Sequence, residues 1–198
     1  MNFKTALTVA AITLVTGVAN AAVNIVNNPE FETPNIGMPG AGYMYTNVVP
    51  NWVVTGNPTV LFNSTYRPVS TGLQAVQIER NGDMLSQNLT TVNGQQYQLS
   101  FDWSTWWLNN TTVSTLEVTS GNVTNPLTGT GTSYSTQSWL FTATSASTTL
   151  SFTNLGVTGT SYPQIDNVSV TAVPEPGTYA MLLAGLAAGG FVAKRRSA

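Results

Sequence analysis

Carboxylates are the main side chains of this chain that could serve acid–base chemistry or bind a metal. The sequence contains no histidine and no cysteine, which excludes Ser-His-Asp and Cys-His catalysis and a zinc site made of these residues. Lysine occurs only at positions 4 and 194, so the residues between them offer no Schiff-base or Ser-Lys chemistry. A glycosidase would need two carboxylates that converge across a cleft, and no spacing in the sequence indicates such a pair. The acids between residues 22 and 172 are Glu30, Glu32, Glu79, Asp83, Asp102, Glu117 and Asp166.

Three tryptophans near the middle of the chain are the chief candidates for binding a ligand. Trp103, Trp106 and Trp107 lie at or just before a stretch rich in Asn and Thr, residues 108–112. A sugar ring presents an apolar face of C–H groups that packs on a flat indole, while amide side chains bind its hydroxyls. We therefore predict a carbohydrate site whose candidate residues are Trp106, Trp107, Asn109 and Asn110. The alternative is that these rings pack at the end of a folded domain, and the register of Trp103 already places it in the core.

Tyrosines in loop-like segments are secondary candidates for the same kind of contact. These are Tyr43, Tyr45 and Tyr66.

The charge of the region between residues 22 and 172 is sparse and negative. Arg67 and Arg80 are its only basic residues, against the acids named above, which gives a net charge of about −5. A surface without a basic patch cannot displace the counterions of a nucleic acid. We therefore expect no nucleic-acid partner, and the abundant Asn, Thr, Ser and Gln suit a neutral, hydroxyl-rich one.

The apolar residues of this region alternate with a period of two. In residues 96–103, Tyr97, Leu99, Phe101 and Trp103 share one face and polar residues the other, which predicts a half-buried strand. Asn93-Gly94 between two such runs indicates a hairpin. We see no helical period outside the two ends, so the expected fold is all-β, an antiparallel sandwich or barrel. Further strands are predicted at 23–26, 48–54, 73–78, 84–89, 114–119, 139–143, 148–154 and 165–173.

The first 21 residues have the organisation of a secretory signal peptide. Lys4 supplies the positive region, residues 6–18 are apolar, and Ala19-Asn20-Ala21 has the small-x-small form of a signal-peptidase site. We expect a signal-peptide helix at 1–21 and a β-sandwich domain at 22–172. An uncut anchor helix is the alternative, and the segment is short for one.

The last 26 residues, 173–198, combine a short motif, an apolar stretch and a basic end. The motif is Pro174-Glu175-Pro176, the apolar stretch of 178–193 predicts a hydrophobic helix, and the basic tail is Lys194-Arg195-Arg196. The basic cluster should stay on the cytoplasmic side of a membrane. This arrangement resembles the PEP-CTERM sorting signal of Gram-negative bacteria. The resemblance implies an exosortase as partner, an anchor in the inner membrane through the C-terminal helix before processing, and then a cell-surface or extracellular location.

A second resemblance covers nearly the whole region between the two ends. Its pieces occur in order at residues 27–32, 50–52, 71–78, 85–89, 94–102 and 165–170. They resemble the galactose-binding-like jelly roll found in carbohydrate-binding modules and bacterial surface domains. The resemblance implies a structural calcium near the meeting of the first and last strands, with Glu32 and Asp166 at the acidic positions. Calcium takes oxygen ligands, so backbone carbonyls would have to complete the site. The alternative is that both are edge carboxylates without a metal.

Together these features predict an exported, non-enzymatic surface or matrix protein that associates with exopolysaccharide in a biofilm matrix. A surface enzyme acting on glycans through carboxylates, and a purely structural coat or adhesive protein, are the alternatives. Calcium is the one cofactor that we expect to consider, and the expected partners are signal peptidase, exosortase and a polysaccharide.

Overall fold

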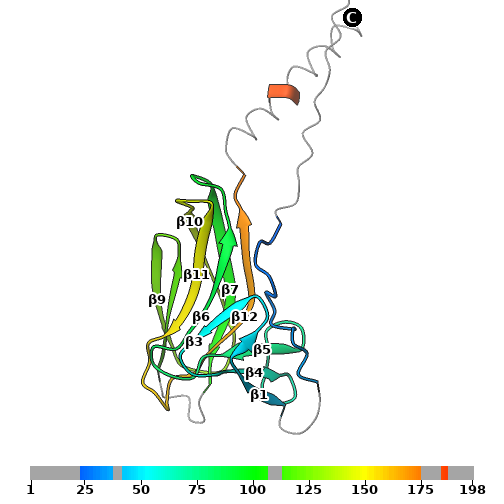
Figure 1. Ribbon diagram of the computed structural model, residues 1–198, viewed down its shortest axis with the longest axis vertical. Coiled ribbons are helices and arrows are strands. Elements are labelled where there is room, and N and C mark those ends of the chain that lie inside the picture. Colours follow the sequence, from blue (N-terminus) through cyan, green and yellow to red (C-terminus); the bar gives the residue numbers. More distant parts are fainter. Residues whose placement is uncertain (1–22, 38–41, 107–112, 175–183, 187–198) are drawn as a thin grey trace, which may run out of the picture. The chain divides into compact units, whose positions relative to one another are not determined.

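The computed structural model describes residues 23–37, 42–106, 113–174 and 184–186 of the chain (Figure 1). The chain divides into two units, Ala22–Val173 and the terminal segments Met1–Ala21 with Pro174–Ala198. The strands of the first unit are β1 (Tyr43–Thr46), β2 (Val48–Val49), β3 (Trp52–Thr55), β4 (Thr59–Asn63), β5 (Gln74–Gln77), β6 (Met84–Thr90), β7 (Gln96–Thr105), β8 (Ser114–Ser120), β9 (Val123–Gly129), β10 (Ser135–Thr142), β11 (Ser147–Asn154) and β12 (Pro163–Ala172).

These strands form two antiparallel sheets, which confirms the predicted β-sandwich of the jelly-roll class. The first sheet has the order β1-β4-β5-β12-β7-β10, and the second has the order β2-β3-β6-β11-β8-β9. β10 pairs along its whole length with residues 96–103 of β7, and β12 pairs with β7 on its other side. The central strands of the two sheets carry the residues that meet in the core.

The core lies between the sheets and is built by the predicted alternation. Tyr97, Leu99, Phe101 and Trp103 of β7 are all buried, and the ring of Phe101 lies 5.0 Å from that of Phe152 on β11. Each fully buried side chain of this size contributes about 1.5–3 kcal/mol to the stability of the fold. Because side chains alternate along a strand, Asp102 and Ser104 of β7 lie on the opposite, outer face of the first sheet.

One end of this outer face is itself covered, by the loop between β4 and β5. Val69 of the loop packs on a small apolar cluster of Val60, Phe62 and Ala75. All five residues of β4 are consequently buried, and so are both faces of β7 from Phe101 to Thr105. The loop thus places its own side chains above the sheet, where they build the candidate site.

The observed strands differ from the predicted ones at three places. Residues 23–26 are not a strand, although the backbone N–H of Ile25 donates to Val170 of β12. The predicted strand 48–54 is divided into β2 and β3 by a turn in which Asn51 has a φ of 69°, a left-handed value that Asn tolerates. The strand predicted at 139–143 begins earlier, at Ser135.

Of the unit formed by the terminal segments, the structure describes Pro174 and residues 184–186, and the latter are helical. The rest of the predicted hydrophobic helix 178–193 and the basic tail 194–196 lie outside the described residues. Within the part of the chain that the structure describes, no helix is both long enough and apolar enough to span a bilayer.

Candidate ligand-binding face

Tyrosines from β1 lie on the outer face of the first sheet. In the register of the sheet, Tyr45 stands opposite Val60 and Tyr43 opposite Phe62, both of which belong to the cluster under the β4–β5 loop. Cross-strand partners project from the same face of a sheet. The two tyrosines therefore extend the covered end of the sheet toward solvent.

Tyr66 of the loop joins the two tyrosines of β1 in one aromatic group. The ring centroids of Tyr43 and Tyr66 are 4.6 Å apart, and those of Tyr43 and Tyr45 are 6.0 Å apart in an edge-on arrangement. All three remain accessible, with exposed fractions of 38 % for Tyr43, 60 % for Tyr45 and 40 % for Tyr66. Three aromatic surfaces thus lie side by side and open to solvent, although they come from separate segments.

Arg67 lies beneath this group and is stacked on several rings. Its guanidinium carbon is 4.0 Å from the ring centroid of Trp106, 4.5 Å from that of Tyr66 and 5.7 Å from that of Phe62. It donates hydrogen bonds to the side-chain oxygen of Gln77 and, at 3.2 Å, to the hydroxyl of Tyr66. Burial lowers the pKa of Arg67, and its Nε has no hydrogen-bond partner. The cation holds Trp106 and Tyr66 in place as one structural unit.

A carboxylate lies at the rim of the same group. The Nε2 of Gln77 donates to Glu79, so one glutamine bridges Glu79 and Arg67. Burial raises the pKa of Glu79, and the charge of Glu79 is the largest cause of the raised pKa of Tyr45. We name the surface formed by Tyr43, Tyr45, Tyr66, Arg67, Glu79 and Trp106 the tyrosine face.

Asp102 ties the loop that carries Tyr66 and Arg67 to the sheet. Its carboxylate accepts hydrogen bonds from the hydroxyls of Ser70 and Thr136 and, at 3.0 Å, from the Nδ2 of Asn167. Burial acts to raise the pKa of Asp102, but these three donors outweigh it, and the net shift is downward. The ionised carboxylate is thus part of the support of the tyrosine face.

Asp166 lies opposite Asp102 across β12 and β7 and anchors the same loop through its backbone. One carboxylate oxygen accepts the N–H groups of Ser70 and Thr71 at 2.9 Å each, and the other accepts that of Asn167 at 2.8 Å. The residue is fully buried, and this burial raises the pKa of Asp166 to about 7 despite the three N–H donors.

Glu32 fastens the far end of the loop in the same manner. Its Oε1 accepts the N–H of Leu73 at 2.6 Å and that of Gln74 at 2.9 Å. Gly72 between them has a φ of 61°, and a Cβ there would lie 2.3 Å from this oxygen, so only glycine allows the approach. Glu32 and Asp166 thus hold the two ends of one short segment, residues 70–74.

The hydrogen bonds of Glu32 and Asp166 bear on the predicted calcium site. Among the described residues, no group of three or more acidic side chains is placed to hold a metal ion. Both oxygens of Asp166 and one oxygen of Glu32 already accept backbone N–H groups. The two carboxylates as they stand bind the loop and do not form a ligand set, so calcium at this position stays a prediction.

The other predicted residues fall into two groups. Trp106 is half-buried and lies on the tyrosine face, and Trp103 is in the core, 5 % exposed, as its register predicts. Trp107, Asn109 and Asn110 lie outside the described residues, as do Glu175 and Pro176 of the motif and Lys194, Arg195 and Arg196 of the tail. Pro174 is described, as part of the segment that follows β12.

The secondary candidates Tyr43, Tyr45 and Tyr66 come together, and the sequence analysis missed the polar residues beneath them. Arg67 directly follows Tyr66 and is one of only two basic residues between positions 22 and 172. A lone cation beside an aromatic residue was the available signal. Gln77 and Glu79 gave none, because their contacts depend on strand pairing.

Comparison with protein families gives matches to two parts of the chain. Residues 24–171 match the family described as "Protein of unknown function (DUF642)", and residues 172–196 match the PEP-CTERM protein-sorting motif. None of the curated proteins searched matches the chain.

Several solved structures are similar to this chain at low sequence identity. A Stig cyclase, Fisc from Fischerella sp. TAU, in complex with an indole derivative, is 17% identical over 78% of this chain and 99% of its own, with a TM-score of 0.59. The enzymatically active domain of tailspike protein 4 of bacteriophage CBA120 is 14% identical over 76% of this chain and 21% of its own, with a TM-score of 0.50. TmCBM61 in complex with β-1,4-galactotriose is 17% identical over 76% of this chain and 99% of its own, with a TM-score of 0.47. At these identities the likeness to the first two structures shows the fold alone.

Proposed function

We propose that this chain, which belongs to the DUF642 family, is an exported, non-catalytic protein that binds extracellular polysaccharide through its tyrosine face. The sorting motif at residues 172–196 implies export and processing by an exosortase. The proposal adds the ligand and the surface that binds it. One observation carries it: three accessible tyrosines from two segments lie together, and one of them, Tyr66, stacks with Trp106 on one buried cation.

The chemistry of the tyrosine face suits a sugar chain. Flat aromatic surfaces bury the C–H faces of sugar rings, and the hydroxyls of the tyrosines exchange hydrogen bonds with the hydroxyls of the sugar. Tyr43 and Tyr45 are two positions apart on β1 and share one face, and the ring of Tyr66 lies beside that of Tyr43. The aromatic surface is therefore longer than a single ring. An elongated surface favours an internal stretch of a polysaccharide over a free monosaccharide.

The carboxylates near this face are arranged for structure. Glu79 is the carboxylate of the tyrosine face and is hydrogen-bonded to Gln77. Asp102 and Asp166 lie buried beneath the loop, where hydroxyl, amide and backbone N–H donors engage them. Neither is presented to a ligand on the tyrosine face, so the arrangement offers no pair of carboxylates for glycoside hydrolysis. The fold shared with a cyclase does not bring an activity with it.

The cellular route follows from the two ends of the chain. We infer that signal peptidase removes the N-terminal 21 residues, that the C-terminal helix anchors the protein in the inner membrane, and that exosortase then cuts near Pro174. The released or transferred domain would meet polysaccharide at the cell surface and in the biofilm matrix. Stacking on a few rings gives modest affinity, with a Kd on the order of 10 μM to 1 mM per site, and retention in a matrix would depend on repeated sites along the polymer.

Affinity electrophoresis tests this function directly. The mature domain, residues 22–173, forms one compact unit and would be run through gels containing the extracellular polysaccharide of the bacterium that makes the protein. We expect the polysaccharide to retard the domain. Tyr43→Ala and Tyr66→Ala should each weaken this retardation and raise the apparent Kd about fivefold, because an aromatic contact contributes about 1 kcal/mol.

Leu155→Ala is the matched control, because Leu155 is an apolar side chain of similar exposure, 41 %, outside the tyrosine face. Retardation that survives both tyrosine substitutions would move the binding site elsewhere. Absence of retardation would leave a structural coat protein as the better description.

A further inference from the structure

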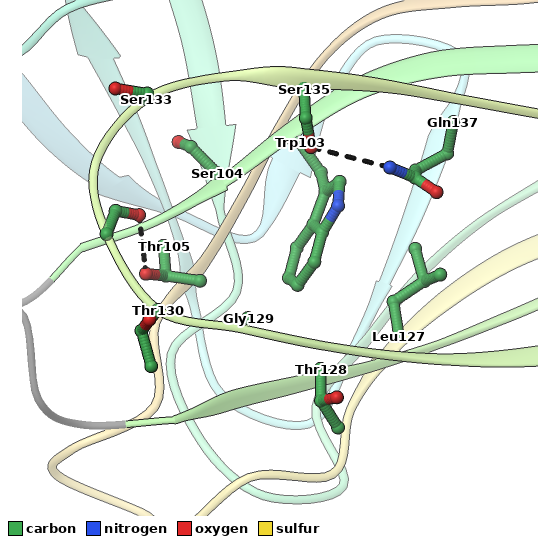
Figure 2. Close-up of a pocket in the computed structure, with 11 residues that line it drawn as sticks. Trp103, Ser104, Thr105, Leu127, Thr128, Gly129, Thr130, Ser133, Ser135 and Gln137 are labelled. Atoms are coloured by element: carbon green, nitrogen blue, oxygen red, sulfur yellow. Dashed lines mark hydrogen bonds between the residues drawn. The ribbon is translucent and has the colours of Figure 1, made fainter.

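A cleft opens between the two sheets at the side where each sheet ends. β10 is the last strand of the first sheet and β9 the last strand of the second. Residues of both strands and of the segment between them line a cavity of about 210 Å³, shown in Figure 2. We name this cavity the edge cleft. None of its lining residues belongs to the tyrosine face, which is formed by β1, the loop after β4, Glu79 after β5 and Trp106 after β7.

The indole of Trp103 lies in the edge cleft and has an unpaired N–H. Figure 2 shows the ring between Gln137 of β10 and the segment of Gly129 in β9. Two of the other tryptophans have partners for this group: Trp52 donates to the backbone oxygen of Asn28 at 3.1 Å and Trp139 to the hydroxyl of Ser120 at 3.2 Å. Among the hydrogen bonds of the described residues, none involves the N–H of Trp103, although this side chain is only 5 % exposed.

The N–H of Trp103 is accessible from the edge cleft, since among the described residues it does not belong to the buried side-chain polar atoms that lack a partner. An accessible indole N–H without a partner inside the protein is free to donate to water or to a ligand. The N–H of Trp103 is not sealed in the core, because its ring borders a cleft that opens at the sheet edges. A ligand in the cleft can therefore accept this hydrogen bond.

Gly129 has no side chain, which allows the indole of Trp103 to pack closely against β9. A Cβ on Gly129 would lie 2.9 Å from Cη2 and 3.0 Å from Cζ2 of Trp103, closer than such atoms pack. The carbonyl oxygen of Gly131 accepts two hydrogen bonds from Thr105, one from the hydroxyl at 2.7 Å and one from the backbone N–H at 3.1 Å. A side chain at position 129 would therefore disturb the packing of the ring on β9, and the two hydrogen bonds to the carbonyl of Gly131 hold the segment after β9 on Thr105.

The lining specifies a neutral and amphipathic ligand. None of the residues that line the cleft carries a charge, and Leu127 and the indole provide its apolar surface. The polar side chains of the lining carry uncharged hydroxyls and one amide and belong to Ser104, Thr105, Thr128, Thr130, Ser133, Ser135 and Gln137. A cavity of 210 Å³ is smaller than the roughly 300–1,000 Å³ of pockets for drug-sized ligands. A single sugar ring combines this size with one apolar face and several hydroxyls.

We propose that the edge cleft is a second binding site, which takes one neutral sugar ring, such as the end of a glycan chain. In this site the N–H of Trp103 donates to an oxygen of the sugar, and the amide of Gln137 and the hydroxyls of the lining bind its other hydroxyls. The site does not depend on the tyrosine face. A protein with both sites would bind the interior of a polysaccharide on one surface and a chain end on another.

Nuclear magnetic resonance of the 15N-labelled domain, residues 22–173, can follow each indole N–H separately. The signal of Trp103 is assigned from its loss in Trp103→Phe, and those of Trp52 and Trp139 in the same way. Methyl β-galactoside and methyl β-glucoside are added in turn to about 100 mM, a range that detects Kd values of weak single-ring sites. We expect a saturable shift of the Trp103 signal with at least one of the two glycosides, together with the side-chain amide of Gln137, and no shift for Trp52 or Trp139.

Two variants test the geometry. Trp103→Phe keeps an aromatic ring and removes the N–H, so the affinity measured on the Gln137 amide should fall about fivefold to tenfold. Gly129→Ala narrows the cleft and should abolish the shift, and the dispersion of its spectrum shows whether the variant is folded. Trp139→Phe is the matched control and should bind as the unmodified domain does.

The two proposals fail independently in this design. An unmoved Trp103 signal with both glycosides, or unchanged affinity in Trp103→Phe, would overturn the edge cleft whatever the polysaccharide gels show. A shift of Trp103 alongside polysaccharide retardation that survives Tyr43→Ala and Tyr66→Ala would support the cleft and remove the tyrosine face.

Discussion

Replacing Asp166 by Asn should remove much of the pH dependence of this domain's stability between about pH 4 and pH 7. Asp166 is fully buried, and its burial raises the pKa from 3.8 to about 7. A pKa difference of about three units between the folded and unfolded chain corresponds to about 4 kcal/mol in the free energy of unfolding.

The sign of this effect follows from the direction of the shift. The folded chain holds the proton more tightly than the unfolded chain, so the contribution is fully present below the unfolded pKa of 3.8. It is lost as the pH rises through about 7, and above that pH this group changes the stability no further. The wild type should therefore lose up to about 4 kcal/mol relative to Asp166→Asn across this window.

Urea unfolding followed by tryptophan fluorescence at several pH values, with a chelator present, measures this difference. Asn at 166 keeps only one carbonyl oxygen for the N–H groups of Ser70, Thr71 and Asn167, so the variant is expected to be less stable at acidic pH. The prediction is tested by how steeply the free energy of unfolding changes with pH in each protein. Burial also raises the pKa of Glu79, but that group remains in both proteins and cancels from the comparison. Parallel pH profiles for the two proteins would refute the reasoning, because they would show that Asp166 does not titrate in this range.

Three further predictions concern the metal, the cation and the termini. If calcium binds through Glu32 and Asp166, a chelator should lower the Tm, and a hundredfold excess of calcium over its Kd should add about 2.7 kcal/mol to the free energy of unfolding. Asp166→Ala should abolish this difference. A melting curve that the chelator leaves unchanged would contradict the calcium site. Arg67→Gln should lower the free energy of unfolding by about 1–2 kcal/mol and weaken polysaccharide binding, because the cation stacks on Trp106 and Tyr66, whereas Arg80→Gln should change neither and serves as the control. Intact-mass analysis of the exported protein should show about 21 residues lost from the front and roughly 22–25 from the back, and a mature form that retains residues beyond 191 would contradict exosortase processing.

The strands with one buried and one exposed face were predictable from the sequence. Tyr97, Leu99, Phe101 and Trp103 alternate with polar residues, and that alternation alone places β7 and the inward face of the first sheet. The same holds for β11, whose buried Leu150 and Phe152 alternate with Ser and Thr. A period of two is a direct consequence of strand geometry, so it survives without knowledge of the partners.

The strands that were not predicted are β1, β4 and β9. Tyr43 and Tyr45 of β1 were expected in a loop-like segment, and β4 and β9 lack this alternation for physical reasons. β4, residues Thr59–Asn63, is buried on both faces because the following loop covers it, so its sequence shows no period. β9 contains Pro126 and is the edge strand of its sheet, where a residue without an N–H is tolerated. Burial by a distant loop and position at an edge are properties of the fold, and neither is written in the local sequence.

The candidate site was predictable in kind and only partly in place. Aromatic residues and the lack of charge indicated a carbohydrate ligand, and Trp106, Tyr43, Tyr45 and Tyr66 now lie on one surface. What joins them is the burial of Arg67 between Trp106 and Tyr66. That contact links residues that are nearly 40 positions apart and depends on how the β4–β5 loop folds over the sheet.

Nitration of tyrosines with tetranitromethane tests the tyrosine face most directly. In the free domain, the exposed rings of Tyr43, Tyr45 and Tyr66 should react, while buried Tyr97 should not. Peptide mapping by mass spectrometry then compares nitration with and without the extracellular polysaccharide. The account predicts that the polysaccharide protects all three exposed tyrosines together, and equal nitration of these three residues in a sample that demonstrably binds polysaccharide would contradict it.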